Sequence, residues 1–275
     1  MKYVLYHGNC YDGFGAAYAA WKFLGGAAKY IPVSYGYPPP DMPDAESIHI
    51  VDFSYPKETL LKLAETAPVT VIDHHKTAEE SLREVLGAHS HLHTIFDMNK
   101  SGALLTWEYF HRHYGPSPAD TEPAPAPLLI QHISDRDLWQ FKMDGTAKIH
   151  KALVSLPMDF KLWDTLDVER LKVEGETCER LYSQLVDTIV KSSWIGRLDG
   201  KNVPMVNTSI AWSEVGAALL EKYYPDCPMV ASFTVFNDQV MWSLRSEKDF
   251  DCSEVAKKFG GGGHKNAAGF KTARF

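Results

Sequence analysis

The stretch Val69-Thr70-Val71-Ile72-Asp73-His74-His75 decides the fold that this sequence predicts. It is a short apolar run that ends in a carboxylate and two imidazoles, and such a run is typical of a buried strand in a parallel sheet. Two similar runs occur earlier, at residues 3–6 before His7 and at residues 48–51 before Asp52. Ligands of open α/β sheets collect at the carboxyl ends of the strands. We therefore expect these side chains to meet at one edge of one sheet.

The first part of the chain alternates strand-like and helix-like segments, which favours an α/β fold with a parallel sheet. We predict strands over 2–7, 29–33, 48–51, 69–72 and 93–96, helices over 13–24, 57–66, 78–86 and 101–114, and a proline-rich loop over 115–127. Ser101 is the expected N-cap of the last of these helices. A helix over 128–133 then leads to Asp135.

The second part of the chain predicts a separate, smaller α/β domain. Residues 165–193 repeat apolar side chains at helical spacing (Leu171, Val173, Cys178, Leu181, Leu185, Ile189), which indicates an amphipathic helical linker. Strands are expected over 203–206, 229–236 and 240–244, with a turn at Asn237-Asp238 and a helix over 215–223. The predicted organisation is a metal-binding catalytic domain over 1–164, a linker over 165–195 and a substrate-binding domain over 196–275.

Composition limits the partners of this protein. The net charge of -7 argues against a broad surface for long duplex DNA, which needs many Lys and Arg side chains. The chain has no apolar stretch long enough for a membrane span and no leader-like start, so we expect no membrane partner and a cytoplasmic location. The four cysteines are widely spaced without a CxxC pair, and we expect reduced thiols. A homodimer is left open.

A set of strand-end side chains predicts a metal site. Its members combine imidazoles and carboxylates: His7, Asp12, Asp52, His74, His75 and Asp135. These ligand types suit Mn²⁺, with Mg²⁺ or Zn²⁺ as alternatives. One aspartate after a strand is more often a turn or capping residue, and one histidine is usually an ordinary polar residue. Several such positions at successive strand ends favour the metal site over that simpler interpretation.

A glycine run near the C-terminus predicts a phosphate contact. Residues 260–269 read GGGGHKNAAG, and backbone N–H groups of Gly261, Gly262 and Gly263 beside a helix start can face a phosphate, with His264 adding a donor. A flexible linker is the simpler alternative, although Ala267, Ala268 and Gly269 favour a packed segment. Arg245, at the end of the preceding strand, is the candidate for a bidentate phosphate contact, against an exposed ion-pairing role.

These motifs together resemble the DHH phosphoesterases with a C-terminal DHHA1 domain, a family that includes nano-RNases. The resemblance spans nearly the whole chain, and its motifs are residues 7–17 (HGNCYDGFGAA), 51–54 (VDFS), 73–75 (DHH), Ser134-Asp135 and 260–269. It implies one or two Mn²⁺ ions held by His7, Asp12, Asp52, His74 and Asp135. It also implies catalytic roles for Asp52 and His75, and substrate contacts from Arg245 and the loop with His264.

The first motif departs from the family pattern. Members commonly have Asp-x-Asp there, and this chain has Cys10 where the first aspartate would fall, with Asp12 matching the second. The second metal site is then either weaker, altered through Asn9 or Cys10, or filled only when substrate is present, and a thiolate would move its preference towards softer ions. Asp137 is a further candidate, either as a partner of the ligands or as a structural acid.

The resemblance implies an oligoribonuclease-like phosphohydrolase that cleaves short oligonucleotides or dinucleotides to 5′-mononucleotides. A nucleotide 3′-phosphatase and a cyclic mono- or dinucleotide phosphodiesterase remain as alternatives, because the sequence does not show the leaving group. An alternative of another class is a nucleotide sensor with weak or no activity, which the Cys10 replacement suggests.

Overall fold

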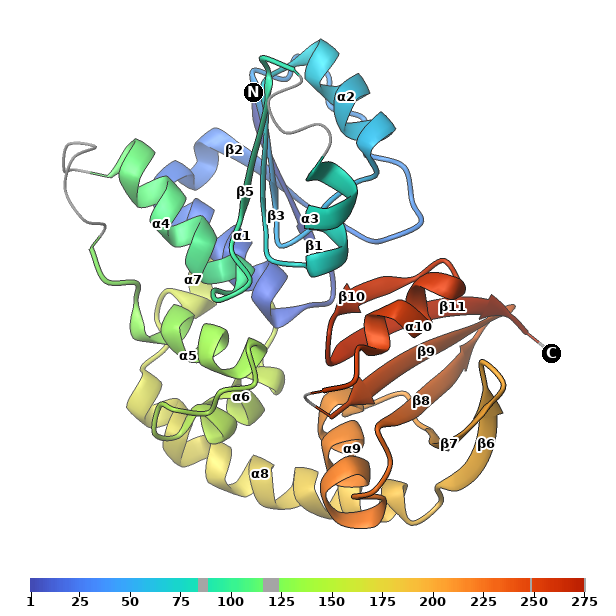
Figure 1. Ribbon diagram of the computed structural model, residues 1–275. Helices are drawn as coiled ribbons and strands as arrows, with labels where there is room; N and C mark the ends of the chain where they lie inside the picture. The colour runs from blue at the N-terminus through green and yellow to red at the C-terminus, as the bar shows by residue number, and fades with distance from the viewer. Residues whose placement is uncertain (84–88, 116–123, 248, 275) are drawn as a thin grey trace. The chain divides into compact units, whose positions relative to one another are not determined.

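The structure is a computed structural model that describes all residues except 84–88, 116–123, 248 and 275 (Figure 1). The chain divides into two compact units, Met1–Glu179 and Arg180–Phe275. Part of the predicted helix over 78–86 and most of the predicted loop over 115–127 lie outside the described residues. The two units are described separately below.

The first unit is built on a parallel sheet of five strands, as the sequence predicts. The strands are β1 (Lys2–His7), β2 (Ala28–Val33), β3 (Ser47–Val51), β4 (Val69–Asp73) and β5 (Leu92–Phe96). They are ordered β2-β1-β3-β4-β5, and every neighbouring pair is parallel. In this order the connections leave the sheet in opposite directions on either side of the β1/β3 boundary, which is where doubly wound sheets bind ligands. His7 ends β1 and Asp52 follows β3, so both residues flank this boundary.

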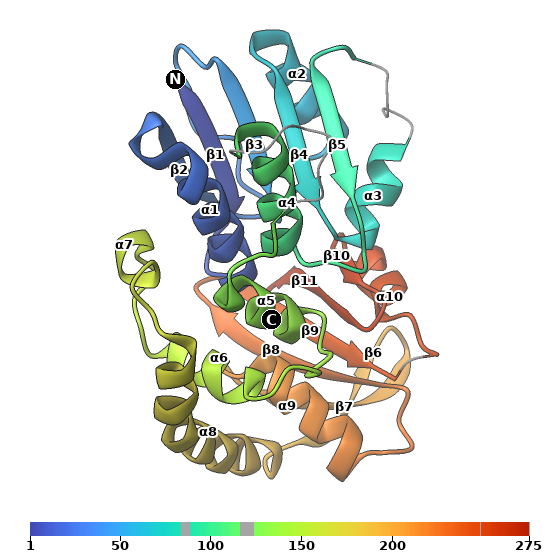
Figure 2. The ribbon, with the colours of Figure 1, turned by 90° about the vertical axis from the view of Figure 1, so that its left-hand side faces the viewer.

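Helices cover both faces of this sheet, and each face has its own core. Helices α1 (Tyr11–Leu24) and α4 (Gly102–Tyr114) lie on one face, and α2 (Lys57–Thr66) and α3 (Lys76–Leu82) lie on the other (Figures 1 and 2). Helix α5 (Leu128–Asp137) packs against α1 and α4. The strands serve both cores by alternation: Val4, Val51 and Ile72 belong to the first, and Leu5, Ile50 and Val71 to the second. This double burial explains the continuous apolar runs in the sequence.

Two local features of the first unit follow from its sequence. Helix α1 buries the small residues Ala16, Ala17, Ala19 and Ala20 completely, and this lets it pack closely against α4. The Ser101 hydroxyl accepts a hydrogen bond from the Leu104 N–H at 3.3 Å, so the predicted N-cap of α4 is confirmed. The unit also contains a 3-10 turn (Gly25–Ala27), α6 (Thr146–Val154) and α7 (Phe160–Trp163).

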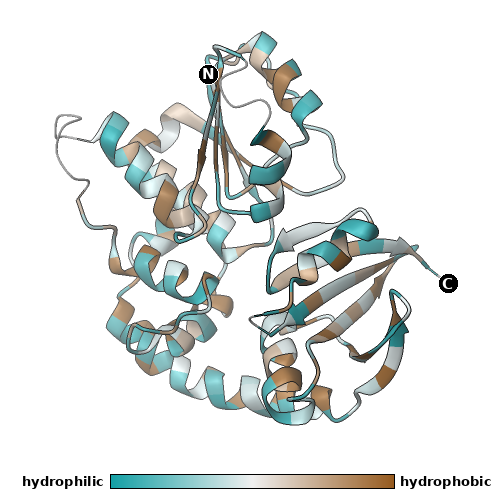
Figure 3. Cartoon of the chain, in the orientation of Figure 1, coloured by the Kyte–Doolittle hydropathy of each residue, from teal (hydrophilic) through white to brown (hydrophobic). Residues whose placement is uncertain are grey.

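The predicted long helix is present as α8 (Val168–Val190), and the boundary between the two units falls within it. The buried face that we expected is wrong in part, because Val173, Leu181 and Leu185 are exposed. Leu171 packs in a core of the first unit, and Val186 and Val190 pack in a core of the second. Burial is thus confined to the ends of the helix, and hydrophilic residues dominate its length (Figure 3).

The second unit contains a mixed sheet of six strands. These are β6 (Trp194–Leu198), β7 (Lys201–Asn207), β8 (Met229–Phe236), β9 (Gln239–Ser246), β10 (Gly262–His264) and β11 (Ala267–Ala273). Their order is β10-β11-β9-β8-β7-β6, and all pairs are antiparallel except β7 and β8. The helical segments are α9 (Trp212–Ala218), a π-helical turn (Leu219–Tyr223) and α10 (Cys252–Lys258). The predicted turn at Asn237-Asp238 joins β8 to β9.

The glycine run differs from our prediction in its surroundings. It follows the end of α10 instead of preceding a helix, and Gly262–His264 form strand β10 of a hairpin with β11. Gly263 has φ +135°, and a Cβ there would lie 2.6 Å from the Ala267 carbonyl oxygen. The glycines therefore serve close approach of two backbones, and the N–H groups of β10 belong to a sheet and not to a helix terminus.

Two expectations from composition can be compared with the structure. All four cysteines are unpaired. Among the described residues, no helix combines the length and apolar character that crossing a bilayer requires.

A histidine in β3 predicts acid sensitivity of the first unit. His49 is 3% exposed, and burial together with the charge of Lys2 lowers its pKa from 6.5 to about 4. Folded His49 thus stays neutral while the unfolded chain takes up a proton below pH 6.5, so stability is lost as the pH falls from 6.5 towards 4. The loss amounts to about 3 kcal/mol at 1.36 kcal/mol per pKa unit. We expect urea unfolding of His49→Gln to show a pH dependence flatter by about this amount than that of the wild type. Parallel curves, or an equal effect of the exposed-residue control His93→Gln, would contradict the assignment.

A candidate metal centre in the first unit

Three carboxylates converge on one imidazole nitrogen at the carboxyl edge of the parallel sheet. His74 Nε2 lies 3.1 Å from Asp52 Oδ1, 3.5 Å from Asp12 Oδ2 and 3.5 Å from Asp137 Oδ2. These residues come from four elements: His74 follows β4, Asp52 follows β3, Asp12 lies in the first turn of α1, and Asp137 ends α5. The predicted meeting of strand-end side chains is thus present in the structure.

Asp52 occupies the middle of this arrangement. It is 1% exposed and adopts φ +53°, a left-handed conformation that is unfavourable for a non-glycine residue and concentrates at functional sites. Its Oδ1 faces His74, and its Oδ2 lies 3.6 Å from His7 Nδ1. Gly102 allows this packing, because a Cβ there would lie 2.5 Å from the Asp52 Cβ. The two oxygens of one carboxylate therefore face two different imidazoles.

Asp12 is held by the start of helix α4. Its two carboxylate oxygens accept hydrogen bonds from the N–H groups of Gly102 and Ala103 at 2.6 and 3.1 Å. The first N–H groups of a helix have no partner within the helix and favour a negative charge. Helix α4 thus fixes Asp12 beside His74.

Asp73 orients His75. The Asp73 carboxylate, which is fully buried, lies 2.6 Å from His75 Nδ1 and accepts hydrogen bonds from the Ser54 hydroxyl and the His74 N–H at 2.6 and 2.8 Å. Burial opposes the charged form of both partners, but their mutual attraction outweighs it, so the pKa of Asp73 is lowered and the pKa of His75 is raised. Asp73 therefore fixes the ring and the protonated nitrogen of His75.

The electrostatics of the cluster favour a cation. Burial would lower the pKa of His74, but Asp52, Asp137 and Asp12 outweigh it and raise this pKa to about 10. Burial, Asp52 and Asp137 raise the pKa of Asp12 well above its ordinary value. Burial would also raise the pKa of Asp52, yet contacts with His7 and His74 hold it well below the ordinary range. Buried carboxylates at this spacing repel each other unless a positive charge lies between them.

The donor atoms fit a divalent ion. Within each of the sets Asp12/Asp52/His74, His7/Cys10/Asp52 and Asp52/Asp73/His75, the ligand atoms all lie within 4.8 Å of one another. Carboxylate oxygens and imidazole nitrogens bind Mn²⁺, Mg²⁺ and Zn²⁺. Asp52 is common to all three sets, so one carboxylate can serve more than one ion. The first unit therefore contains clusters that can hold metal.

The structure gives different surroundings to the two acids of α5. Asp135 accepts hydrogen bonds from the N–H groups of Lys142 and Met143 at 2.9 and 3.0 Å and from the Thr146 hydroxyl at 2.6 Å. Asp137, two residues later, instead approaches His74. Asp135 stays a predicted metal ligand, and its contacts are those of an acid that organises a loop.

Two further residues of the predicted site have distinct positions. Asn9 is exposed with φ +57°, as expected in a turn. Cys10 is the N-cap residue of α1, but its side chain makes no capping hydrogen bond. Cys10 instead groups with His7 and Asp52.

Tyr35 belongs to this site, and our sequence reasoning missed it. Its ring centroid lies 5.4 Å from that of His7, 4.4 Å from that of Phe53 and 6.4 Å from that of His75. The residue lies in a loop after β2, where no repeat or spacing distinguishes it from Tyr37.

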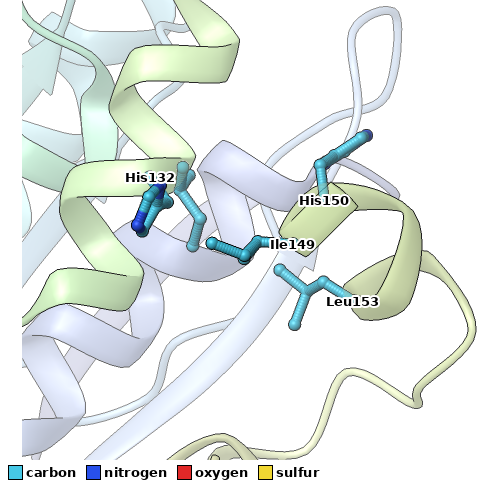
Figure 4. Close-up of a pocket in the computed structure, with 5 residues that line it drawn as sticks. His132, Ile149, His150 and Leu153 are labelled. Carbon is cyan, nitrogen blue, oxygen red and sulfur yellow. The ribbon is translucent and has the colours of Figure 1, made fainter. Parts of the chain in front are cut away.

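A small cavity lies between α5 and α6. It has a volume of about 10 Å³ and is lined by His132 and Ile133 of α5 and by Ile149, His150 and Leu153 of α6 (Figure 4). This volume holds a single water molecule at most. Within α5 and α6, His132 Nδ1 donates to the Thr146 hydroxyl at 2.8 Å, which in turn donates to Asp135. The cavity is therefore too small for a nucleotide. One of its lining residues, His132, supports Asp135 through the Thr146 hydroxyl.

The predicted phosphate contacts of the second unit share one row of the sheet. Arg245 of β9 pairs with Ala267 of β11, and Ala267 pairs with His264 of β10. Directly paired residues project from the same face, so Arg245 and His264 lie two strand spacings apart, about 10 Å. The Arg245 guanidinium donates to the hydroxyl oxygens of Ser213 and Ser243 at 2.7 and 2.9 Å, which fixes its direction. Gly261 precedes β10, and Gly262 and Gly263 lie in it.

Comparison with known proteins agrees with this architecture. Residues 202–274 match the DHHA1 domain family. The Acanthamoeba polyphaga mimivirus protein R106, described as uncharacterized, is 29% identical over 292 residues, covering 97% of this chain and 66% of the viral protein. The chain thus spans less than two thirds of the length of this relative.

Two solved structures are also similar. An exopolyphosphatase-related protein from Bacteroides fragilis superposes with a TM-score of 0.56 at 16% identity, covering 98% of this chain and 86% of that protein. A pGpG-specific phosphodiesterase from Vibrio cholerae gives a TM-score of 0.43 at 15% identity, covering 99% of this chain and 93% of that protein. The match over residues 202–274 confirms the predicted DHHA1 domain, and the first of these structures shares the fold of the chain.

The different contacts of Asp135 and Asp137 give a paired test. We expect Asp137→Asn to weaken Mn²⁺ binding at least about tenfold while leaving the unfolding midpoint nearly unchanged. Asp135→Asn should instead cost about 1–3 kcal/mol of stability, because the Lys142 and Met143 N–H groups and the Thr146 hydroxyl lose a charged acceptor. Calorimetric titration and urea unfolding of both variants measure the two effects. The reverse pattern, with Asp135→Asn abolishing metal binding in a stably folded protein, would assign the ligand to Asp135.

Proposed function

We propose that this protein is a metal-dependent phosphohydrolase that cleaves phosphodiester bonds of short oligonucleotides or dinucleotides to 5′-mononucleotides. The observation that supports this most is the convergence of Asp12, Asp52 and Asp137 on His74. A buried group of carboxylates around an imidazole is suited to holding a divalent ion, and the DHHA1 domain agrees with a phosphoester substrate. Mn²⁺ is the proposed ion, with Mg²⁺ as the alternative for an oxygen-rich site.

Asp12, Asp52, His74 and Asp137 would hold the principal ion. When bound, such an ion lowers the pKa of a coordinated water and offsets negative charge on a phosphoryl group. Asp52, through its second oxygen, faces His7 and Cys10, which would hold a second ion. Helix α4 keeps Asp12 in place with two N–H donors, so the ligand set is arranged before an ion arrives.

His75 is the proposed catalytic donor. Asp73 holds its Nδ1 at 2.6 Å and raises its pKa, so the imidazolium form persists beyond the ordinary range. A protonated imidazole beside the carboxylate cluster can donate a hydrogen bond to a phosphate oxygen or a proton to the leaving oxygen. Asp73 acts here as a positioning residue, because it contacts His75 and not the substrate.

In the second unit, Arg245 and His264 would bind a phosphate or the far end of the nucleotide. The Arg245 guanidinium is oriented by Ser213, Ser243 and the Leu244 carbonyl, and its positive charge would attract an anion to this face of the sheet. The backbone of Gly261, Gly262 and Gly263 would contribute N–H groups only where strand pairing leaves them available. The net charge of -7 argues against long duplex DNA as a substrate.

The alternative functions differ in the bond that is cleaved or in whether any bond is cleaved. A nucleotide 3′-phosphatase would release inorganic phosphate, a cyclic mono- or dinucleotide phosphodiesterase would open a cyclic diester, and a sensor would bind without turnover. The intact carboxylate cluster favours an enzyme over a sensor, because a binding protein needs no buried metal ligands beside a histidine fixed by Asp73. A cytoplasmic location and a possible homodimer stay proposals that rest on the sequence.

The main test is turnover with a substrate panel. Purified protein with Mn²⁺ should cleave 5′-labelled di- to pentanucleotides to mononucleotides, and chelation should stop the reaction. Asp52→Asn should lower the rate more than about 100-fold, since it changes the charge on the shared ligand, whereas the exposed-residue control Asp41→Asn should not. A near-normal rate for Asp52→Asn would contradict the assignment of Asp52 as a metal ligand. Inactivity of the wild type on every member of the panel would favour the sensor.

The second unit has its own prediction. Arg245→Lys keeps the charge but loses the paired donors, and we expect a KM for dinucleotides raised about tenfold with little change in kcat. His264→Ala should act in the same direction. A loss confined to kcat in a normally folded variant would instead place these residues at the reacting bond.

A further inference from the structure

We propose that His7, Cys10 and Asp52 form a sulfur-containing metal site that selects Zn²⁺ over Mn²⁺, beside an oxygen-rich site that favours Mn²⁺. This inference rests on the metal-binding part of the proposed function. It assigns the two ions of the centre different chemistries, and it gives Cys10 a ligand role.

Two buried polar atoms point to an ion at this position. His7 Nδ1 and Asp52 Oδ2 are both buried without a hydrogen-bond partner, and they lie 3.6 Å apart. Leaving a buried carboxylate oxygen and a buried ring nitrogen unsatisfied costs about 1–3 kcal/mol each. The donor atoms of His7, Cys10 and Asp52 all lie within 4.8 Å of one another. An ion bound among them would satisfy both atoms.

Cysteine is an unusual residue at the position that Cys10 occupies. It occupies the N-cap position of α1, where Ser, Thr, Asp or Asn usually accepts a hydrogen bond, yet its side chain makes no capping hydrogen bond. The preceding residue, Asn9, has φ +57°, a left-handed conformation that asparagine tolerates, and this turn places Cys10 beside His7. The side chain is only partly buried, which leaves a path for an ion.

The donor types determine which ion is preferred. Thiolate and imidazole are ligands of Zn²⁺, at about 2.3 and 2.0–2.1 Å, and thiolate is a poor ligand for Mn²⁺ and Mg²⁺. Binding converts the Cys10 thiol to the thiolate and releases one proton to solvent. The neighbouring set of Asp12, Asp52, Asp137 and His74 offers three carboxylates and no sulfur, which suits Mn²⁺. Asp52 is common to both sets, so the two sites are coupled through one carboxylate.

Cobalt(II) provides a direct probe, because a Co²⁺–thiolate bond produces an intense near-ultraviolet charge-transfer band. We would use the full chain carrying Cys178→Ser and Cys227→Ser as the background, since these two cysteines are only partly buried and lie in other segments. Titration with Co²⁺ should develop the band in this background. Cys10→Ser should abolish it, and Cys10→Asp should abolish it while still binding metal.

A competition experiment tests the selectivity. After dialysis against equal concentrations of Zn²⁺ and Mn²⁺, the wild type should retain one Zn²⁺ per chain, and Cys10→Asp should shift the Zn²⁺/Mn²⁺ ratio towards Mn²⁺ at least about tenfold. Circular dichroism confirms that each variant is folded, and Cys10→Asp keeps the test valid if Cys10→Ser is unstable. A missing band in the background protein, or an unchanged ratio in Cys10→Asp, would overturn the proposal. Neither readout requires turnover, so absence of hydrolysis alone would reject the proposed function and leave this site standing.

Discussion

The arrangement depends on one buried carboxylate whose two oxygens face different partners. Asp52 Oδ1 lies 3.1 Å from His74 Nε2, and Asp52 Oδ2 lies 3.6 Å from His7 Nδ1. To reach this position the residue takes a left-handed backbone with φ +53°. The parallel sheet stabilises it from below, because the Asp52 N–H donates to the Ile72 carbonyl at 2.8 Å. Hydrogen bonding to the neighbouring strand thus helps to hold Asp52 in its unfavourable backbone conformation.

The surroundings of Asp52 show how the fold serves the site. The β1/β3 boundary brings His7 and Asp52 to adjacent strand ends, and β4 adds His74 on the other side. Helix α4 contributes the N–H groups that hold Asp12, and Gly102 at its start makes room for Asp52. Most of the cluster is therefore positioned by regular structure, which gives more precise geometry than loops do.

The sequence predicted those parts of the site that follow from strand ends. Apolar runs before His7, Asp52 and His74 identify buried parallel strands, and the carboxyl ends of such strands share one edge. The same reasoning could not distinguish Asp135 from Asp137, because the choice depends on the exact turn at which α5 ends. Tyr35 was missed for a similar reason, since its contacts depend on the path of an irregular loop.

The sequence-based prediction was wrong or incomplete at three places, and each has a physical reason. The apolar spacing of α8 correctly indicated a helix, but Val173, Leu181 and Leu185 are exposed because only the ends of the helix meet a core. The glycine run suggested a phosphate loop at a helix start, and it instead allows β10 and β11 to approach closely. Helix α6, helix α10 and strand β10 were not predicted, and at nine, seven and three residues they are too short for their patterns to stand out. Local patterns identify elements, whereas packing decides which face is buried.

The central claim, that Asp52 is the shared ligand of a metal centre, can be tested by crystallography with Mn²⁺ and anomalous scattering. We expect an anomalous peak within about 2.2 Å of an Asp52 carboxylate oxygen, the range for small divalent ions bound to oxygen, with Asp12, His74 and Asp137 as its other protein ligands. Absence of any peak near Asp52 at saturating Mn²⁺, in crystals that bind the ion elsewhere, would contradict the account.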